Sequence, residues 1–136
     1  MDRQSSLLSQ APLFSQLPPE ALEQLNSRLR RRRYGKGDTV FYQGDPGMSL
    51  CIVQSGRVKL ALTSAEGREL IIDLLGPGDV FGEMALLDGE PRSADAVATE
   101  PSELVMLERE EFIRFLLERP PIAVQLLGIL SRRLRR

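Results

Sequence analysis

Residues 79–97 read DVFGEMALLDGEPRSADAV, and the pattern in this stretch decides the fold expected for the whole chain. An apolar strand ends at Gly82, one or two helical turns follow as far as Leu87, residues 88–91 form a turn, and Arg92 leads into the next strand. A short helix between two strands directs its N-terminal amides at one place, which is a natural position for an anion. The stretch therefore predicts a strand–helix–strand segment with an anion site.

The side chains of this segment indicate what kind of anion would bind. Arg92 can return toward the amides and offer a planar fork to a phosphate, and Ser93 adds a hydroxyl. Glu83 only accepts hydrogen bonds when ionised, so it suits a sugar hydroxyl better than a phosphate. The implied ligand has one phosphate and a free ribose hydroxyl. The residues alone also allow a partly buried Glu83–Arg92 ion pair that only fixes the loop.

Short β-prone runs separated by glycine-containing turns surround this segment. Seven or eight short strands at close, regular spacing indicate an antiparallel sandwich or jelly roll. In one run the apolar residues Val58, Leu60 and Leu62 alternate with polar ones, which predicts a single buried face. The expected strands are 39–42, 50–54, 57–63, 69–75, 79–81, 94–98 and 103–108.

Helical spacing of apolar residues occurs at both ends of the chain. Pro18-Pro19 separates two short helices near the N-terminus, and Pro120-Pro121 separates two helices near the C-terminus. We expect a single, mainly β domain over 1–136. Its parts are N-terminal helices at 5–29, an antiparallel β-roll or jelly roll at 30–108 and C-terminal helices at 109–136.

Composition excludes several functional classes. The 136 residues are 42% hydrophobic and 27% charged, as in ordinary globular domains. The chain has no histidine and one cysteine, so His-based catalytic triads, HExxH zinc sites, internal disulfides and iron–sulfur clusters are excluded. Cys51 lies in an apolar run and is interpreted as a small buried side chain. We expect neither enzymatic activity nor a metal or cofactor.

Targeting signals are also missing from the pattern. The longest mostly apolar stretch, 122–130, is far shorter than the roughly 20 residues that span a bilayer. The first residues lack the basic segment and apolar core of a secretory signal. We therefore expect a soluble, cytoplasmic protein without a membrane partner.

Arginines are unevenly distributed, with nine of the 16 in two clusters. The first cluster, Arg28 with 30–33, suits either a nucleic-acid patch or, as the acidic remainder of the chain favours, a solvated helix end that runs into a strand. The second, at 132–136, suits the C-terminus of a helix, where cations complement the macrodipole.

The segment FGEMALLDGEPRSA, residues 81–94, resembles the phosphate-binding cassette of cyclic-nucleotide-binding domains. That cassette reads roughly F-G-E-hydrophobic-A/G-L, a short spacer, then P-R-S/T/A-A. Turn glycines of the family match Gly35, Gly37, Gly44, Gly56, Gly76 and Gly78. The resemblance implies a β-roll of the cupin-like, double-stranded β-helix type. It also implies that cyclic AMP or a close relative binds as an effector.

The resemblance assigns roles to six cassette residues. It implies that Gly82 and Glu83 bind the ribose 2′-hydroxyl and that Arg92 binds the cyclic phosphate. The cradle is completed by the backbone amides of Met84 and Ala85 and by Ser93. Asp95 departs from the family pattern, because many members have Thr, Ser or an apolar residue at that position.

The segment 120–136 resembles the long dimerisation helix of Crp–Fnr transcription regulators. One row of residues has the 4-3-4 spacing that predicts contact with a partner helix in a homodimer, and a second apolar face would pack on the β-roll. The alternative is a helix packed entirely on its own domain. Arg133 is a possible contact for the base. The first row is Ala123, Leu127, Leu130 and Leu134, and the second is Ile122, Leu126 and Ile129.

These resemblances predict the cyclic-nucleotide-sensing domain of a Crp–Fnr-type transcription regulator. In that family a winged helix-turn-helix domain follows the long helix, so DNA would be bound only through a domain that these residues do not include. Two alternatives stay open: a stand-alone cyclic-nucleotide module that regulates a partner protein, and a degenerate member that only dimerises. The sequence does not distinguish cyclic AMP from cyclic GMP.

Overall fold

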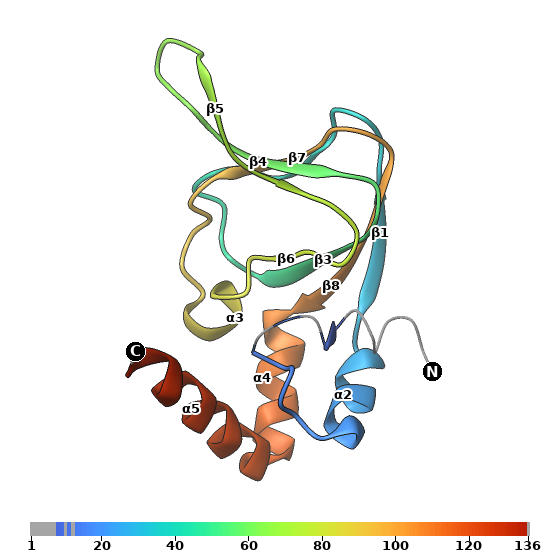
Figure 1. Ribbon diagram of the computed structural model, residues 1–136, viewed down its shortest axis with the longest axis vertical. Coiled ribbons are helices and arrows are strands. Elements are labelled where there is room, and N and C mark those ends of the chain that lie inside the picture. The colour runs from blue at the N-terminus through green and yellow to red at the C-terminus, as the bar shows by residue number, and fades with distance from the viewer. Residues whose placement is uncertain (1–7, 10, 12, 136) are drawn as a thin grey trace.

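Two four-stranded antiparallel sheets face each other above a group of helices (Figure 1). The structure is a computed structural model that describes residues 8, 9, 11 and 13–135, apart from the side chain of residue 133. The first sheet has the strand order β1 (Arg30–Tyr34), β8 (Ser102–Glu108), β3 (Ser49–Ser55), β6 (Val80–Phe81). The second has the order β2 (Thr39–Phe41), β7 (Asp95–Ala98), β4 (Val58–Thr63), β5 (Glu69–Leu75). The helices are α2 (Pro19–Asn26), α3 (Ala85–Asp88), α4 (Arg109–Glu118) and α5 (Pro120–Leu134). The predicted antiparallel β-roll with flanking helices is confirmed.

Strand β3 contributes to two separate cores. Leu50 and Ile52 pack into the cluster formed with the helices, whereas Cys51 and Val53 belong to the cluster between the two sheets. Successive side chains of a strand point to opposite faces, which is why one apolar run can serve both clusters. Cys51 is fully buried, as expected, and burial raises the pKa of its thiol from 9.0 to about 11. The thiol is therefore protonated at neutral pH.

The expected alternation along β4 holds only in part. Val58 is buried and Leu60 packs against the inter-sheet cluster, but the pairing register with β5 shifts between Leu60 and Ala61. Beyond the shift Ala61 is buried and Leu62 is only half-buried. An irregularity of this kind moves the following side chains to the opposite face, so the single face expected for Val58, Leu60 and Leu62 is wrong at Leu62.

The first arginine cluster runs from the end of a helix into a strand, which is the arrangement that the acidic remainder of the chain favoured. Helix α2 ends at Asn26, and residues 30–33 are themselves strand β1, which lies at the edge of its sheet and pairs with β8. Glu103 and Glu108 on β8 form ion pairs with Arg33 at 3.3 Å and with Arg30 at 3.4 Å. Arginine has no strong strand preference, so local propensity does not predict this strand; pairing with β8 accounts for it.

Pro120-Pro121 separates two helices as predicted, and Pro19 begins the helix expected after Pro18. Helix α2 has Pro19 in its first turn, and α5 begins at Pro120 directly after the C-cap of α4. Of the helix expected before Pro18, Leu8 is helical, residues 13–16 form turns, and most of the remainder lies outside the described residues. No helix in the described part of the chain is long and apolar enough to span a membrane.

Helix α5 has the two faces that its periodicity predicts. Ile122, Leu126 and Ile129 are buried in the cluster with the other helices and the β-roll. Leu127 and Leu134 remain 65% and 86% exposed. A helix packed entirely on its own domain is therefore not what the structure shows.

Candidate functional site

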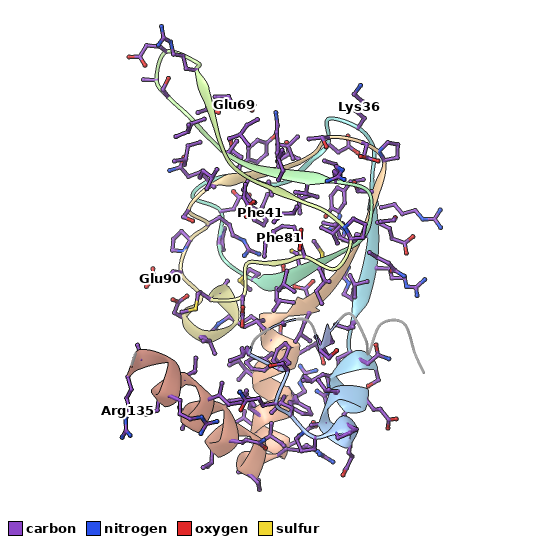
Figure 2. All side chains as sticks on the ribbon, in the orientation of Figure 1. Lys36, Phe41, Glu69, Phe81, Glu90 and Arg135 are labelled. Atoms are coloured by element: carbon purple, nitrogen blue, oxygen red, sulfur yellow. The ribbon has the colours of Figure 1, made fainter. Side chains whose placement is uncertain are left out.

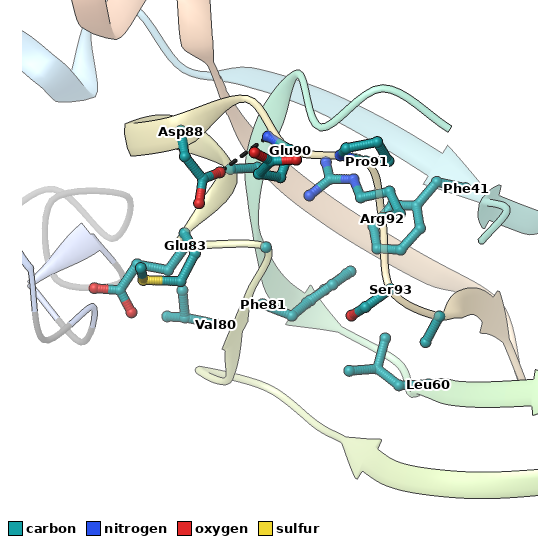
Figure 3. A pocket seen from close by; sticks show the side chains of 14 residues that line it. Phe41, Leu60, Val80, Phe81, Glu83, Asp88, Glu90, Pro91, Arg92 and Ser93 are labelled. Carbon is teal, nitrogen blue, oxygen red and sulfur yellow. Dashed lines mark hydrogen bonds between the residues drawn. The ribbon is translucent and has the colours of Figure 1, made fainter. Parts of the chain in front are cut away.

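The cassette borders a cavity of about 330 Å³, within the range of small-molecule sites (Figure 3). Phe41 of β2 and Leu60 of β4 form part of the lining. Figure 2 shows Phe41 and Phe81 near each other inside the roll. Their ring centroids are 5.9 Å apart. The structure brings all six predicted cassette residues together around this cavity: Gly82, Glu83, Met84, Ala85, Arg92 and Ser93.

The backbone at Gly82 is compatible only with glycine. Its φ is +76°, and a Cβ there would lie 2.5 Å from Nη1 of Arg92 and 3.0 Å from the carbonyl oxygen of Ser49. Helix α3 begins three residues later, at Ala85, and is a single turn. The amide of Ala85 donates a long hydrogen bond of 3.2 Å to the Gly82 carbonyl, so a ligand would share this amide with the turn.

Arg92 is a buried cation that contacts polar groups and a ring. Arg92 is only 8% exposed. Its Nη2 donates one hydrogen bond to the carbonyl oxygen of Ser49 at 2.7 Å and another to Oγ of Ser49 at 3.2 Å. The guanidinium carbon lies 4.2 Å from the centroid of the Phe41 ring. The buried Nε has no hydrogen-bond partner. No carboxylate among the described residues lies within ion-pair distance of the guanidinium.

Glu83 is oriented away from Arg92 (Figure 3). Its Oε1 accepts a hydrogen bond of 2.8 Å from the backbone amide of Leu13, which belongs to the N-terminal segment before α2. The ion pair between Glu83 and Arg92, which the sequence left open, is therefore not the arrangement in the structure. The carboxylate of Glu83 is thus bonded to the N-terminal segment.

The carboxylate of Asp95 is occupied outside the cavity. Its Oδ1 accepts a hydrogen bond of 2.7 Å from the amide of Gln43, in the connection after β2. Asp95 is not among the residues that line the cavity, whereas the neighbouring Ser93 is. The departure from the family pattern at Asp95 thus has a structural role in the roll.

Sequence reasoning missed Phe41 and Ser49. The Ser49–Arg92 contact joins residues 43 positions apart, and Phe41 approaches from the other sheet. Within its own strand each residue looks ordinary, so no local pattern marks either one as a neighbour of Arg92. The sequence offered no signal for them.

The residues predicted on α5 have unequal surroundings. Ala123 is half-buried, and Leu130 packs partly against the helical cluster. Leu127 and Leu134 are the exposed members of the row. Arg133, the predicted base contact, lies in α5, but its side chain falls outside what the structure describes.

Residues 31–119 match the family model of the cyclic nucleotide-binding domain, and the chain belongs to this family. Over 125 residues it is 46% identical to the cyclic AMP receptor protein of Thermus thermophilus, covering 92% of this chain and 58% of the relative. Over 130 residues it is 36% identical to the CRP-like cAMP-activated global transcriptional regulator of Mycobacterium tuberculosis, covering 96% and 58%.

A solved structure of a transcriptional regulator domain also resembles this chain. The N-terminal domain of a transcriptional regulator from Streptomyces coelicolor A3(2) superposes with a TM-score of 0.87 at 37% identity, covering 95% of this chain and 90% of that one. The chain spans 58% of the length of each of the two sequence relatives. The functions of those longer proteins can therefore only be proposed for this chain.

Proposed function

We propose that this domain binds cyclic AMP in the cassette cavity and is the sensor part of a Crp–Fnr-type transcription regulator. One observation carries the proposal: the buried guanidinium of Arg92 borders the cavity without a carboxylate partner among the described residues. Burying a cation is costly unless a counter-charge is supplied, and a cyclic phosphate supplies one. Both sequence relatives are named for cyclic AMP.

In the proposed mode of binding, the two ends of the cassette contact different parts of the ligand: Arg92 contacts the phosphate and Glu83 the ribose. Arg92 neutralises the phosphodiester, and Ser93 with the amides of Met84 and Ala85 completes the cradle. Glu83 exchanges the Leu13 amide for the ribose 2′-hydroxyl, both of which are hydrogen-bond donors to a carboxylate. Binding of the sugar is thereby coupled to the N-terminal segment.

The nucleotide proposal is tested by thermal unfolding with and without millimolar cyclic AMP, followed by calorimetric titration with cyclic AMP and cyclic GMP. A ligand that binds only the folded state raises the unfolding temperature. We expect a rise with cyclic AMP in the unaltered protein. A well-folded protein whose unfolding temperature does not change would remove the proposal.

The regulatory part of the proposal needs a dimer and a DNA-binding domain. We propose that α5 pairs with its counterpart through Leu127 and Leu134, which are exposed in the single chain. Burying a leucine is worth roughly 1.5–3 kcal/mol, which offsets part of the cost of association. DNA would be bound through a helix-turn-helix domain outside these residues. A module that regulates another protein is the alternative.

Sedimentation tests the dimer. Replacing Leu127 and Leu134 with Glu should give a monomer, whereas Leu117→Glu should not, because Leu117 is equally exposed but lies on α4. If the unaltered chain is already monomeric at high micromolar concentration, these 136 residues do not dimerise as proposed.

A further inference from the structure

We infer that Phe41 and Ser49 are positioning residues that hold the Arg92 guanidinium in place for an anion without neutralising it. The inference rests on the proposed function of the cavity and adds two residues to it. Neither residue belongs to the cassette. They approach Arg92 from different sheets, Phe41 from β2 and Ser49 from the start of β3.

The two contacts fix different degrees of freedom of the guanidinium. The guanidinium carbon lies over the Phe41 ring, 4.2 Å from its centroid, so the ring limits movement of the cation on that side. Ser49 accepts twice from one nitrogen, Nη2, through its carbonyl oxygen and its hydroxyl, and so restricts rotation within the plane. Together they leave the Nε–H without a protein partner.

The supporting residues are themselves held. Phe41 packs on Phe81, with centroids 5.9 Å apart, and Ser49 is only 8% exposed. On a third side, Nη1 lies so close to Gly82 that a Cβ there would be 2.5 Å away. A guanidinium restricted from three sides loses little freedom when a ligand binds, which is the advantage of preorganisation.

The groups that contact Arg92 explain why its charge remains available to an anion. A carboxylate beside Arg92 would stabilise the buried charge but would compete with an incoming phosphate for it. A ring face, a carbonyl and a hydroxyl stabilise the cation through a quadrupole and dipoles and carry no net charge. The positive charge of Arg92 therefore remains uncompensated within the described site until an anion enters.

Calorimetric titration with cyclic AMP tests the ring contact. Phe41→Leu should weaken binding roughly ten-fold, because a desolvated cation–π contact is lost, while Phe41→Tyr keeps a ring and should stay within about two-fold of the parent. Ser49→Ala keeps the shorter bond, to the carbonyl, and should cost only a few-fold. Phe115→Leu is the matched control, because Phe115 is a fully buried ring in the helical cluster that contacts a different arginine, Arg28, and does not line the cavity. It should lower the unfolding temperature and leave the affinity unchanged.

A ligand-free measurement separates this inference from the proposed function. A proton above the face of a ring is shielded, so the Nε–H resonance of Arg92, assigned by its disappearance in Arg92→Lys, should move downfield in Phe41→Leu and return in Phe41→Tyr. If the parent binds no nucleotide, the proposed function fails, and the resonance still decides the placement of Arg92. If the parent binds but Phe41→Leu changes neither affinity nor resonance, the inference is overturned.

Discussion

The two charged residues of the cassette are anchored to different parts of the molecule. Arg92 is held inside the β-roll by Phe41 and Ser49, whereas Glu83 accepts a hydrogen bond from Leu13, which lies outside the roll in the N-terminal segment. An anion entering the cavity meets a guanidinium already in place. In the proposed binding mode, a ribose hydroxyl meets a carboxylate that must first give up a charge-assisted bond worth about 1.5–3 kcal/mol. In the proposed binding mode, Arg92 with Phe41 and Ser49 forms a preorganised phosphate half of the site, the prepared half. Glu83 forms the sugar half, which must exchange one hydrogen bond for another and is called the switching half.

Replacing Arg92, the charged residue of the prepared half, should have the largest effect on the affinity for cyclic AMP. We expect Arg92→Leu to weaken cyclic AMP binding by two orders of magnitude or more, since hydrogen bonds to charged groups contribute about 1.5–3 kcal/mol each. Arg92→Lys should recover part of the affinity, because a point charge cannot reproduce the fork. Calorimetric titration gives both values.

The stability of the same variants provides the control. Replacing a buried cation that lacks a carboxylate partner in the described structure by an apolar residue should leave the unfolding temperature unchanged or raise it. Lost binding in a stable protein would assign the role of Arg92 to the ligand. A similar affinity in Arg92→Leu and the parent would show that the phosphate is not bound there.

Replacing Glu83, the charged residue of the switching half, should have a smaller effect on affinity and a specific effect on recognition of the ribose. Glu83→Ala should weaken cyclic AMP binding about ten-fold, because it loses one charge-assisted bond and no longer has to release Leu13. The parent should prefer cyclic AMP to its 2′-deoxy analogue, and Glu83→Ala should bind both equally. A preference that survives in the variant would place the ribose contact on another residue.

The same contrast explains how far the sequence could predict the site. The cassette is local, so its resemblance to a known motif could assign Glu83 and Arg92 to one cavity, and the period of 3.6 residues identified the buried face of α5. Phe41 and Ser49 reach Arg92 through the pairing of strands far apart in the chain, which no local pattern contains.

Two further differences have the same physical origin. Residues 30–33, which were not among the expected strands, form a strand because β8 offers a pairing edge and two glutamates. The register shift between Leu60 and Ala61 depends on β5 and moves the buried position to Ala61. In each case tertiary pairing overrides local propensity.

Hydrogen exchange should detect the switch at a single amide. When cyclic AMP saturates the protein, the Leu13 amide loses its acceptor Glu83 and should exchange faster, while the 2′-deoxy analogue should leave it unchanged. The matched control is the amide of Gly44, which donates to the carbonyl of Arg92 at 2.8 Å and belongs to the prepared half. Faster exchange at Gly44 but not at Leu13 would reverse the assignment of the two halves.

The smallest expected effect concerns Cys51, which lies beside Ser49 at the prepared half, with Sγ 3.9 Å from its hydroxyl. Burial raises the pKa of this thiol to about 11 and outweighs the opposing charge of Arg92. The folded protein therefore holds the proton more tightly than the unfolded chain. This contribution to stability is fully present below the unfolded pKa and is lost as pH rises from about 9 to about 11. Over that window the free energy of unfolding should fall by up to about 1.4 kcal/mol per pH unit.

The measurement must separate Cys51 from Tyr34. Burial also raises the pKa of Tyr34, which changes stability with pH in the same direction, so the parent is compared with Cys51→Val. Urea unfolding at pH 8, 9 and 10 should give a shallower decline in the variant. Equal slopes would mean that the thiol ionises as readily in the folded protein as in the unfolded chain, and that the surroundings of Arg92 are more hydrated than this packing implies.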